Sequence, residues 1–526
     1  MRPMSEEVAE LSGRLRVAAV AVVVGAVGLG IVLRFSTHSA LWLDEALTVD
    51  IARLPLHDLP TRLRHDGAPP LFYVLLHFWM GIFGQSDEAT RSLSGVIGVV
   101  TLPVAWLAAK EFAGRSVAWT TLVLLASAPF AVYYATEARM YALVIFLTAC
   151  GLLALRRAVL TPRAGNLVAV ALLTAALMYT QYWSLYLIAV VGIWLVASML
   201  WSHRTGRPWR DRLPALVAVG VGCLLFVPWL PTFVYQSVHT GTPWAAPPNF
   251  SAVINAVTGF TDNQGSTTGS GTNQGRLLAV VYFAMAALGL FGLGRSERVI
   301  ELDVRTRPRA RAISFVVAGT LFAAIAGGIL SKSAFAPRYA AVVFFPLVVL
   351  IALGTTTLLS ARIRACVVLV AVVAGMVSSA QNIDTQRTQA TQVAAVINTL
   401  ARPGDVIAFC PDQLGPSVYR LVRDPSRYDM LTFPRRTGPA IVDWVDYADA
   451  VHAASPTAFV ADLLSRAGHT HRIWYVWQPG YQTYGAKCEE MASLLLQSPG
   501  VGGHTWVGDH PMKFYEPMNL TEYAPS

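Results

Sequence analysis

Long runs of apolar residues recur along the chain from Arg16 to Gln381, separated by short polar segments. Runs of about 17–25 apolar residues are long enough to cross a bilayer as helices. The sequence after Gln381 reads as a soluble domain. The expected fold is therefore a polytopic α-helical membrane protein with a C-terminal globular domain. We predict about eleven spans, at 16–35, 92–110, 116–133, 140–156, 164–181, 184–201, 213–232, 276–294, 312–331, 338–359 and 363–380.

The composition agrees with a membrane protein and argues against a nucleic-acid partner. Hydrophobic residues make up 54% of the chain and charged residues 13%, whereas a soluble domain carries roughly 25% charged residues. The net charge of +9 does not indicate nucleic-acid binding, because the basic residues lie in short loops between the spans. Short basic loops usually face the cytoplasm. These residues include Arg14, Arg16, Lys110, Arg115, Arg156, Arg157, Arg163, Arg204, Arg207, Arg210, Arg212, Arg305, Arg307, Arg362 and Arg364.

The distribution of basic residues also decides how the apolar segment 69–84 is interpreted. By its composition, this segment could be a span or a helix on the outer surface. Counting it as a span would place two basic loops outside the cell. The segment is also short for a span, and its Tyr, His and Trp suit the headgroup layer. We therefore expect residues 1–384 to form the transmembrane module. In it, the first external loop, 36–91, would carry a juxtamembrane helix at 69–84.

Residues 385–526 are predicted to form an extracytoplasmic α/β domain. Cys410 and Cys488 are the only cysteines in it, and an outside compartment permits a disulfide between them. The sequence leaves open whether their geometry allows that bond. Strands are expected at 406–410, 472–477 and 513–515, and helices at 388–400, 413–422, 458–467 and 489–497.

Polar residues gather at the outer ends of several spans, and the acidic pair Asp44 and Glu45 comes first. Carboxylates this close to lipid are costly unless they face water or a ligand. Each candidate also has an ordinary reading, since acids cap helices, arginines reach toward headgroups and aromatic residues anchor span ends. The other candidates are His65, Tyr134, Glu137, Arg139, Tyr141, Lys332, Arg338 and Tyr339.

Taken together, these residue types suit a reaction between a hydroxyl nucleophile and a phosphate leaving group. A carboxylate can accept the proton of an acceptor hydroxyl as a general base. Arginine and lysine can bind a phosphate and stabilise the charge that it gains on leaving. A lipid-linked phosphate would sit with its headgroup at this depth. The pattern therefore fits glycosyl transfer from a lipid carrier.

Three local motifs resemble the GT-C superfamily of polytopic glycosyltransferases, in its branch of protein mannosyltransferases and aminoarabinose transferases. Residues 41–46 (LWLDEA) are similar to the acidic motif of that family's first external loop. Residues 67–73 (GAPPLFY) resemble its HPPLYY helix start, and residues 133–143 (YYATEARMYAL) resemble its YYSxEARMYAL segment. Residues 337–339 (PRY) are a weaker match to a late Arg-Tyr pair.

The resemblance implies transfer of a sugar, mannose or a pentose, from a polyprenyl-phosphate donor on the external face. It implies Asp44 as general base and Glu45 as a residue that shapes the site. Glu137 and Arg139 would line the donor pocket, and Arg338 would contact the donor phosphate. The remaining candidates named above would also bind the donor. Two departures are present: the family's His before Pro-Pro is Ala68, so its role is vacant or passes to His65, and the second external turn lacks a DxD pattern.

No cofactor is expected, although Asp44, Glu45 and Glu137 offer a weak alternative site for a divalent cation. The acceptor is left open among lipid, polysaccharide and protein, and the C-terminal domain is expected to recognise it or to cover the cavity. The expected location is the cell membrane, with membrane lipids as neighbours. Two other classes remain open: a transporter or flippase of a polyprenyl lipid or glycolipid, and a non-catalytic glycan-binding membrane protein. Transporters usually carry internal repeats and midplane charges, and neither is visible here.

Overall fold

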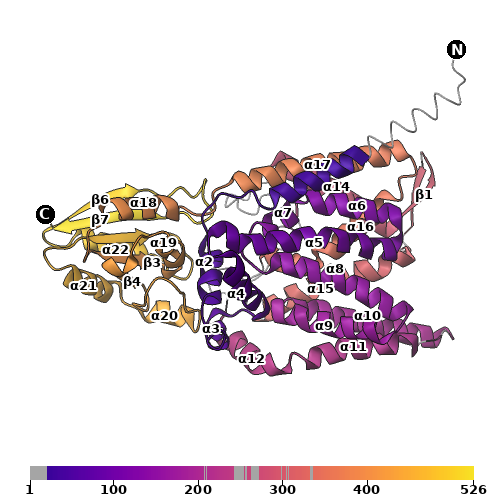
Figure 1. The fold of residues 1–526 in the computed structure, drawn as a ribbon, viewed down its shortest axis with the longest axis horizontal. Helices are drawn as coiled ribbons and strands as arrows, with labels where there is room; N and C mark the ends of the chain where they lie inside the picture. Colours follow the sequence, from indigo (N-terminus) through magenta and orange to yellow (C-terminus); the bar gives the residue numbers. More distant parts are fainter. Residues whose placement is uncertain are drawn as a thin grey trace, which may run out of the picture.

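The computed structural model describes residues 20–206, 208, 210–241, 254, 258–261, 272–297, 299–303, 305, 307–331 and 336–525. A bundle of long helices forms most of the molecule, and a smaller sheet domain lies at one end of it (Figure 1). The helices of the bundle are Val20–Leu33, α5 (Asp87–Ala113), α6 (Arg115–Ser127), α7 (Pro129–Ala135), α8 (Tyr141–Leu160), α9 (Ala164–Thr180), α10 (Ser184–Arg204), α11 (Leu213–Leu224), α12 (Leu230–His239), α14 (Asn273–Phe291), α15 (Pro308–Ser331), α16 (Ala341–Thr355) and α17 (Ala361–Asp384).

The prediction of a polytopic helical protein is confirmed, with a difference in helix lengths. Among the described residues, eight helices are long and apolar enough to cross a membrane, or nine if the bent pair α6–α7 is one span. Of the remaining two predicted spans, 164–181 coincides with the shorter apolar helix α9, and the described part of 16–35 coincides with the helix Val20–Leu33. The 56° bend between α6 and α7 falls at Ala128, because the proline that follows disfavours helical geometry in that residue.

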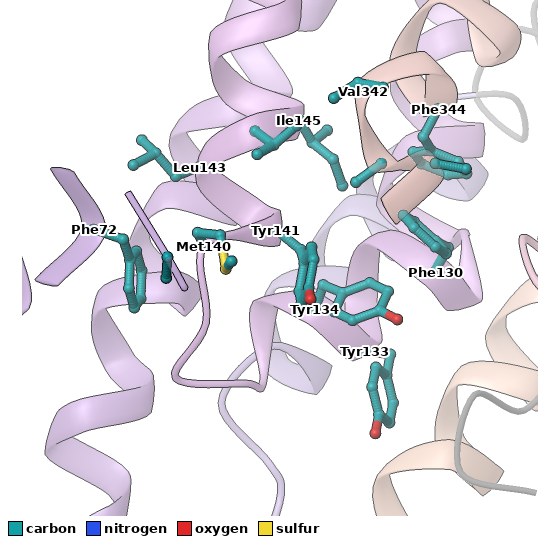
Figure 2. Close-up of a cluster of buried hydrophobic side chains, with 14 of the residues drawn as sticks. Phe72, Phe130, Tyr133, Tyr134, Met140, Tyr141, Leu143, Ile145, Val342 and Phe344 are labelled. Carbon is teal, nitrogen blue, oxygen red and sulfur yellow. The ribbon is translucent and has the colours of Figure 1, made fainter. Parts of the chain in front are cut away.

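Helix α16 is the centre of the bundle, since every one of its residues is buried. It packs against α6, α8, α14 and α15. An apolar helix that is buried on all sides belongs to the interior of a bundle. Phe344 of α16 contacts Phe130 of α7 at a ring distance of 4.7 Å (Figure 2). This contact fixes α7 next to the turn that carries the candidates Glu137 and Arg139.

Three short helices follow the first bundle helix and lie between the bundle and the sheet domain (Figure 1). They are α2 (Leu43–Ala52), α3 (Leu59–Asp66) and α4 (Leu71–Phe83). Helix α4 covers most of the segment that we predict as juxtamembrane, and its 13 residues are few for a span. It buries Phe72 and Leu76, while Phe78 and Ile82 are exposed. An apolar face left uncovered in this way suits contact with lipid.

The C-terminal domain contains a five-stranded sheet of order β4-β3-β5-β7-β6. Strand β3 is parallel to β4 and β5, and β7 is antiparallel to β5 and β6. The strands are β3 (Val406–Cys410), β4 (Asp429–Thr432), β5 (Ile473–Trp477), β6 (Val501–Val507) and β7 (Asn519–Pro525). The helical elements are α18 (Ala390–Leu400), η4 (Asp412–Leu414), α19 (Gly415–Tyr419), α20 (Tyr447–Ala453), α21 (Pro456–Ala467) and α22 (Lys487–Leu496).

The α/β prediction for this domain is right in class and partly wrong in its elements. The strands at 406–410 and 472–477 and three of the four helices are present. The strand predicted at 513–515 is wrong, since that segment is a turn before β7. The helix predicted at 413–422 is divided into η4 and α19. Strands β4, β6 and β7 escaped prediction because polar and glycine residues interrupt their apolar pattern, and sheet pairing overrides such weak local preference.

Cys410 at the end of β3 and Cys488 in α22 form a disulfide, with their Cα atoms 5.5 Å apart. Both side chains are buried. The bond joins a central strand to a helix that covers the sheet. It encloses a long segment, with a sequence separation of 78 residues.

Replacing both cysteines with serine should lower the free energy of unfolding of the domain by about 2–4 kcal/mol, because a long closed loop restricts the unfolded chain. Thermal unfolding of the full chain in detergent, with and without reductant, measures this effect. The control is Cys366→Ser, which alters an exposed free thiol and should leave the transition unchanged. Equal stability of the double variant and the wild type would contradict the prediction.

Candidate active site

A cavity of about 710 Å³ lies where the bundle meets the C-terminal domain. Six parts of the membrane module line it: the start of α2, residues 66–69 before α4, the turn before α8, the segment between α9 and α10, residues 240–241 after α12, and η3 (Pro337–Ala340). The domain contributes Gln413, Trp444 and residues 478–482 and 515–517. Sites at the junction of two structural units are common for small ligands. This cavity contains the charged residues that the sequence singled out at the span ends.

Asp44 is the carboxylate at the centre of this wall. It lies in the first turn of α2, where a negative charge is favoured by the helix dipole. Its Oδ2 atom lies 3.9 Å from Nη2 of Arg139 and 3.8 Å from Nη2 of Arg338. The side chain is 18% exposed, so it faces the cavity. An acid and two guanidinium groups from three separate parts of the chain therefore meet in one place.

Arg139 is held in position by neighbours on α2 and α4. It donates a hydrogen bond of 2.7 Å to Oγ1 of Thr48 and one of 3.4 Å to the hydroxyl of Tyr73. That hydroxyl in turn donates to Asp66 at 2.6 Å. Burial raises the pKa of Asp66, and the nearby Arg139 partly opposes the shift. The network fixes the guanidinium group beside Asp44 before any ligand binds.

Arg338 connects the membrane module with the C-terminal domain. It begins the helical segment that leads into α16, and it donates a 3.4 Å hydrogen bond to the hydroxyl of Tyr515. The Tyr515 ring meets the Trp42 ring edge-on at 5.0 Å. Tyr141 and Tyr339 also line the cavity. Five of the predicted residues thus share the cavity wall, namely Asp44, Arg139, Tyr141, Arg338 and Tyr339.

Glu45 is predicted together with Asp44 as an acidic pair that forms the site, but it is not among the residues that line the cavity. It is fully buried, and Arg91 donates to its two oxygens at 2.7 and 2.5 Å. The backbone amide of Ala138 donates at 2.9 Å, and Arg387 lies 3.6 Å away. Burial alone would raise the pKa of Glu45, but Arg91 and Arg387 hold it below its ordinary value. Consecutive residues on a helix point about 100° apart, so Asp44 and Glu45 face different surroundings.

Glu137 and Tyr134 are also packed beneath the wall instead of forming it. Glu137 is buried and accepts a 2.9 Å hydrogen bond from Nε1 of Trp42. Burial raises the pKa of Glu137 to about 7. Tyr134 packs between Phe130 and Tyr141, at ring distances of 4.6 and 4.7 Å (Figure 2). These residues support the cavity wall from behind.

The remaining predictions concern two residues expected to bind the donor, His65 and Lys332, and the weak metal site. His65 lies 3.0 Å from Asp443 of the C-terminal domain and is not among the residues that line the cavity. Lys332 lies outside the described residues. The set Asp44, Glu45 and Glu137 does not converge on one point, because Glu45 is engaged by Arg91. Within the described part of the chain, no group of three His, Cys, Asp or Glu residues could hold a metal ion.

Glu516 is a cavity residue that the sequence interpretation missed. It lies just before β7 and accepts a 3.1 Å hydrogen bond from the amide of Leu43, next to Asp44. Burial raises the pKa of Glu516 to about 8, and hydrogen bonds from Thr388 and Ser417 oppose this only partly. Gln181 and Gln478, which are both buried on the wall, were missed as well. Their neighbours in the sequence carry no motif that could have indicated them.

The raised pKa of Glu516 predicts a specific dependence of stability on pH. The folded state keeps its proton up to about pH 8, whereas the ordinary value is 4.5, so the folded state binds more protons between these values. The stabilisation is fully present below pH 4.5 and is lost as the pH rises through about 8. Thermal unfolding of the full chain should therefore show a melting temperature that falls over this range. Glu516→Gln should flatten the fall, and the exposed Glu490→Gln should not; parallel curves for all three proteins would contradict the assignment.

The chain is similar to known membrane glycosyltransferases. Residues 67–231 match the family model described as dolichyl-phosphate-mannose-protein mannosyltransferase. The structure of ArnT from Cupriavidus metallidurans bound to undecaprenyl phosphate aligns with a TM-score of 0.58 and 13% identity, over 95% of this chain and 97% of that one. Its apo state gives 0.59 and 13%, over 97% and 98%. No curated protein sequence gives a match.

The archaeal oligosaccharyltransferase AglB from Archaeoglobus fulgidus, in complex with an inhibitory peptide and a dolichol-phosphate, is also similar. It aligns with a TM-score of 0.50 and 12% identity, over 97% of this chain and 74% of that one. The fold and the spans define a polytopic membrane protein of the GT-C glycosyltransferase fold. The family-model match over residues 67–231 agrees with the resemblance to protein mannosyltransferases that the sequence motifs indicate.

Proposed function

We propose that this membrane glycosyltransferase transfers a sugar, mannose or a pentose, from a polyprenyl-phosphate donor to an acceptor on the extracytoplasmic face. The observation that carries the proposal is the meeting of Asp44, Arg139 and Arg338 in one cavity at the end of the bundle. The similar proteins agree with a donor of this kind, since one ArnT structure contains undecaprenyl phosphate and one AglB structure contains a dolichol-phosphate.

In this proposal, the donor phosphate binds to Arg139 and Arg338, which now lie against Asp44. The acceptor hydroxyl attacks the anomeric carbon of the sugar. A bond forms from the acceptor oxygen to this carbon, and the bond from the carbon to the phosphate oxygen breaks. Asp44 receives the hydroxyl proton, and the polyprenyl phosphate leaves with the electron pair, stabilised by the two arginines. The arginines supply positive charge at the phosphate, so the proposal includes no divalent cation.

The proposed orientation places the cavity and the C-terminal domain outside the cell, in the cell membrane. The basic pair Lys110 and Arg115 lies at the α5–α6 junction, at the end of α5 far from the sheet domain. The other end of α5 touches that domain, because Arg420 pairs with Asp87 at 3.2 Å. Basic loops favour the cytoplasmic side, and the disulfide of the domain suits an oxidising compartment. Charge and redox chemistry therefore support the same orientation.

The test of this function is the cleavage of undecaprenyl-phosphate mannose or undecaprenyl-phosphate pentose by the purified chain in nanodiscs. Release of undecaprenyl phosphate, together with gain of labelled sugar by acceptors in a cell-envelope extract, is the expected result. A flippase would move the lipid between leaflets with the sugar bond intact, and a glycan-binding protein would do neither. An intact donor after prolonged incubation with the extract would overturn the proposal.

Arg338→Gln should weaken donor binding about 10- to 100-fold, because a hydrogen bond to a charged group contributes about 1.5–3 kcal/mol. Binding of undecaprenyl phosphate to the full chain, measured by calorimetry, checks the prediction directly. Arg276→Gln is the matched control, since this arginine is exposed at the start of α14 and lies outside the cavity. Equal affinity of Arg338→Gln and the wild type would remove this arginine from the donor site.

A further inference from the structure

The part of the cavity that the C-terminal domain provides differs in chemistry from the part that the bundle provides. Among the described residues, the two arginines of the wall belong to the membrane module, and the domain contributes neither lysine nor arginine. Its polar residues are mostly glutamines, and Glu516 is its one acid. The domain side, which we call the acceptor wall, comprises Gln413, Trp444, Gln478, Tyr481, Tyr515 and Glu516.

Hydrogen-bonding groups on this cavity are left without partners in the described part of the protein. Gln478 is buried, and its Nε2 donates to Asp509 at 3.3 Å, but its Oε1 accepts no hydrogen bond from the described residues. Across the cavity, neither amide atom of the buried Gln181 is paired within the described chain. Buried polar groups are nearly always hydrogen-bonded, and an unmade bond costs about 1–3 kcal/mol. These amides are therefore suited to a ligand that both donates and accepts.

Aromatic rings lie beside these amides on the acceptor wall. Trp444 and Tyr481 are half-buried there, and Tyr515 packs edge-on against Trp42. Such rings provide an apolar face next to a polar edge. A sugar ring has the complementary chemistry, with apolar C–H faces and hydroxyl groups that donate and accept. An anionic acceptor would call for cations, and the domain contributes neither lysine nor arginine to this wall. The acyl chains of a lipid would call for a continuous apolar surface, whereas Gln413, Gln478 and Glu516 interrupt the aromatic rings here.

We propose that the acceptor is a neutral carbohydrate chain, bound by the acceptor wall with Gln478 and Tyr481 as its principal contacts. This inference rests on the proposed function, because it names the substrate that receives the sugar. Glu516 accepts from the amide of Leu43 beside Asp44, so a hydroxyl held at this end of the wall lies next to the proposed base. The membrane module binds the charged donor, and the domain selects the uncharged acceptor.

The test measures binding in the absence of donor, using the full-length chain in nanodiscs. The probes are neutral mannose and arabinose hexasaccharides, their phosphorylated counterparts and an unmodified peptide. We expect the neutral oligosaccharides to bind in preference to the others. Gln478→Ala and Tyr481→Ala should each weaken that binding about tenfold. Gln497→Ala removes an exposed glutamine far from the wall and should leave it unchanged, and unchanged melting temperatures exclude misfolding.

Absence of binding to every neutral oligosaccharide, tighter binding of the phosphorylated probes or the peptide, or wild-type affinity in both wall variants would overturn the inference. Failure here is distinguishable from failure of the proposed function. Sugar transfer to a peptide or a lipid would contradict the carbohydrate acceptor and leave the glycosyltransferase standing. A different outcome is that Gln478→Ala weakens glycan binding but the donor is not cleaved under any condition. This result would support the acceptor wall and count against the transfer reaction.

Discussion

Replacing Asp44 with asparagine should reduce sugar transfer by about 10²–10⁴-fold, the contribution expected of a general base. Asparagine has nearly the same shape, so the start of α2 and the cavity should keep their structure. It cannot accept the hydroxyl proton, and it removes the negative charge that lies between Arg139 and Arg338. The initial rate of transfer from the labelled polyprenyl-phosphate donor to envelope acceptors measures the loss.

The matched control for this variant is Asp58→Asn. Asp58 belongs to the same external segment, but its side chain is 55% exposed and makes no capping hydrogen bond to α3. We expect wild-type transfer rates from this control and unchanged melting temperatures from both variants. Transfer by Asp44→Asn at more than about a tenth of the wild-type rate would show that another group accepts the proton.

Replacing Glu45 with alanine should lower the free energy of unfolding by about 3–5 kcal/mol, because it leaves buried cations without their partner. Arg91 donates to both oxygens of Glu45, and Arg387 lies 3.6 Å away. Arg387 also donates to Thr136 on the turn before α8. It belongs to the segment that joins α17 to the C-terminal domain, so the loss should loosen the attachment of the domain as well.

Denaturant titration in micelles and limited proteolysis of the joining segment measure these two effects. Glu111→Ala is the control, because it breaks an ion pair with Arg157 in which both side chains are substantially exposed. Such a pair contributes about 0–1 kcal/mol. Similar stability losses in Glu45→Ala and Glu111→Ala would contradict the structural role assigned to Glu45.

The sequence alone does not distinguish the different environments of Asp44 and Glu45. The two residues are adjacent in one motif, and their composition offers no way to separate a cavity residue from a buried structural one. Helical geometry turns them in different directions. Asp44 then meets Arg338, which follows eight further predicted spans, while Glu45 meets Arg91 and Arg387. Only the packing of the helices decides which of these two acids faces the cavity.

The missed residues of the C-terminal domain have a related explanation. Glu516 and Gln478 lie in short irregular segments next to β7 and β5, where no periodic pattern marks a function. Their importance arises because the sheet domain is placed against the start of α2, so that Glu516 accepts from the amide of Leu43. A contact between two distant segments leaves no local signature in either one.

The sequence by itself determined the membrane class, the positions of the helices and the candidate acid at the first span, because apolar length and the cost of charges near lipid act locally along the chain. The tertiary structure alone decided which charges share a cavity, which are buried as ion pairs, and that the C-terminal domain supplies one wall of the site. These features depend on distances between segments far apart in sequence, which are set by helix packing and by the docking of the sheet domain.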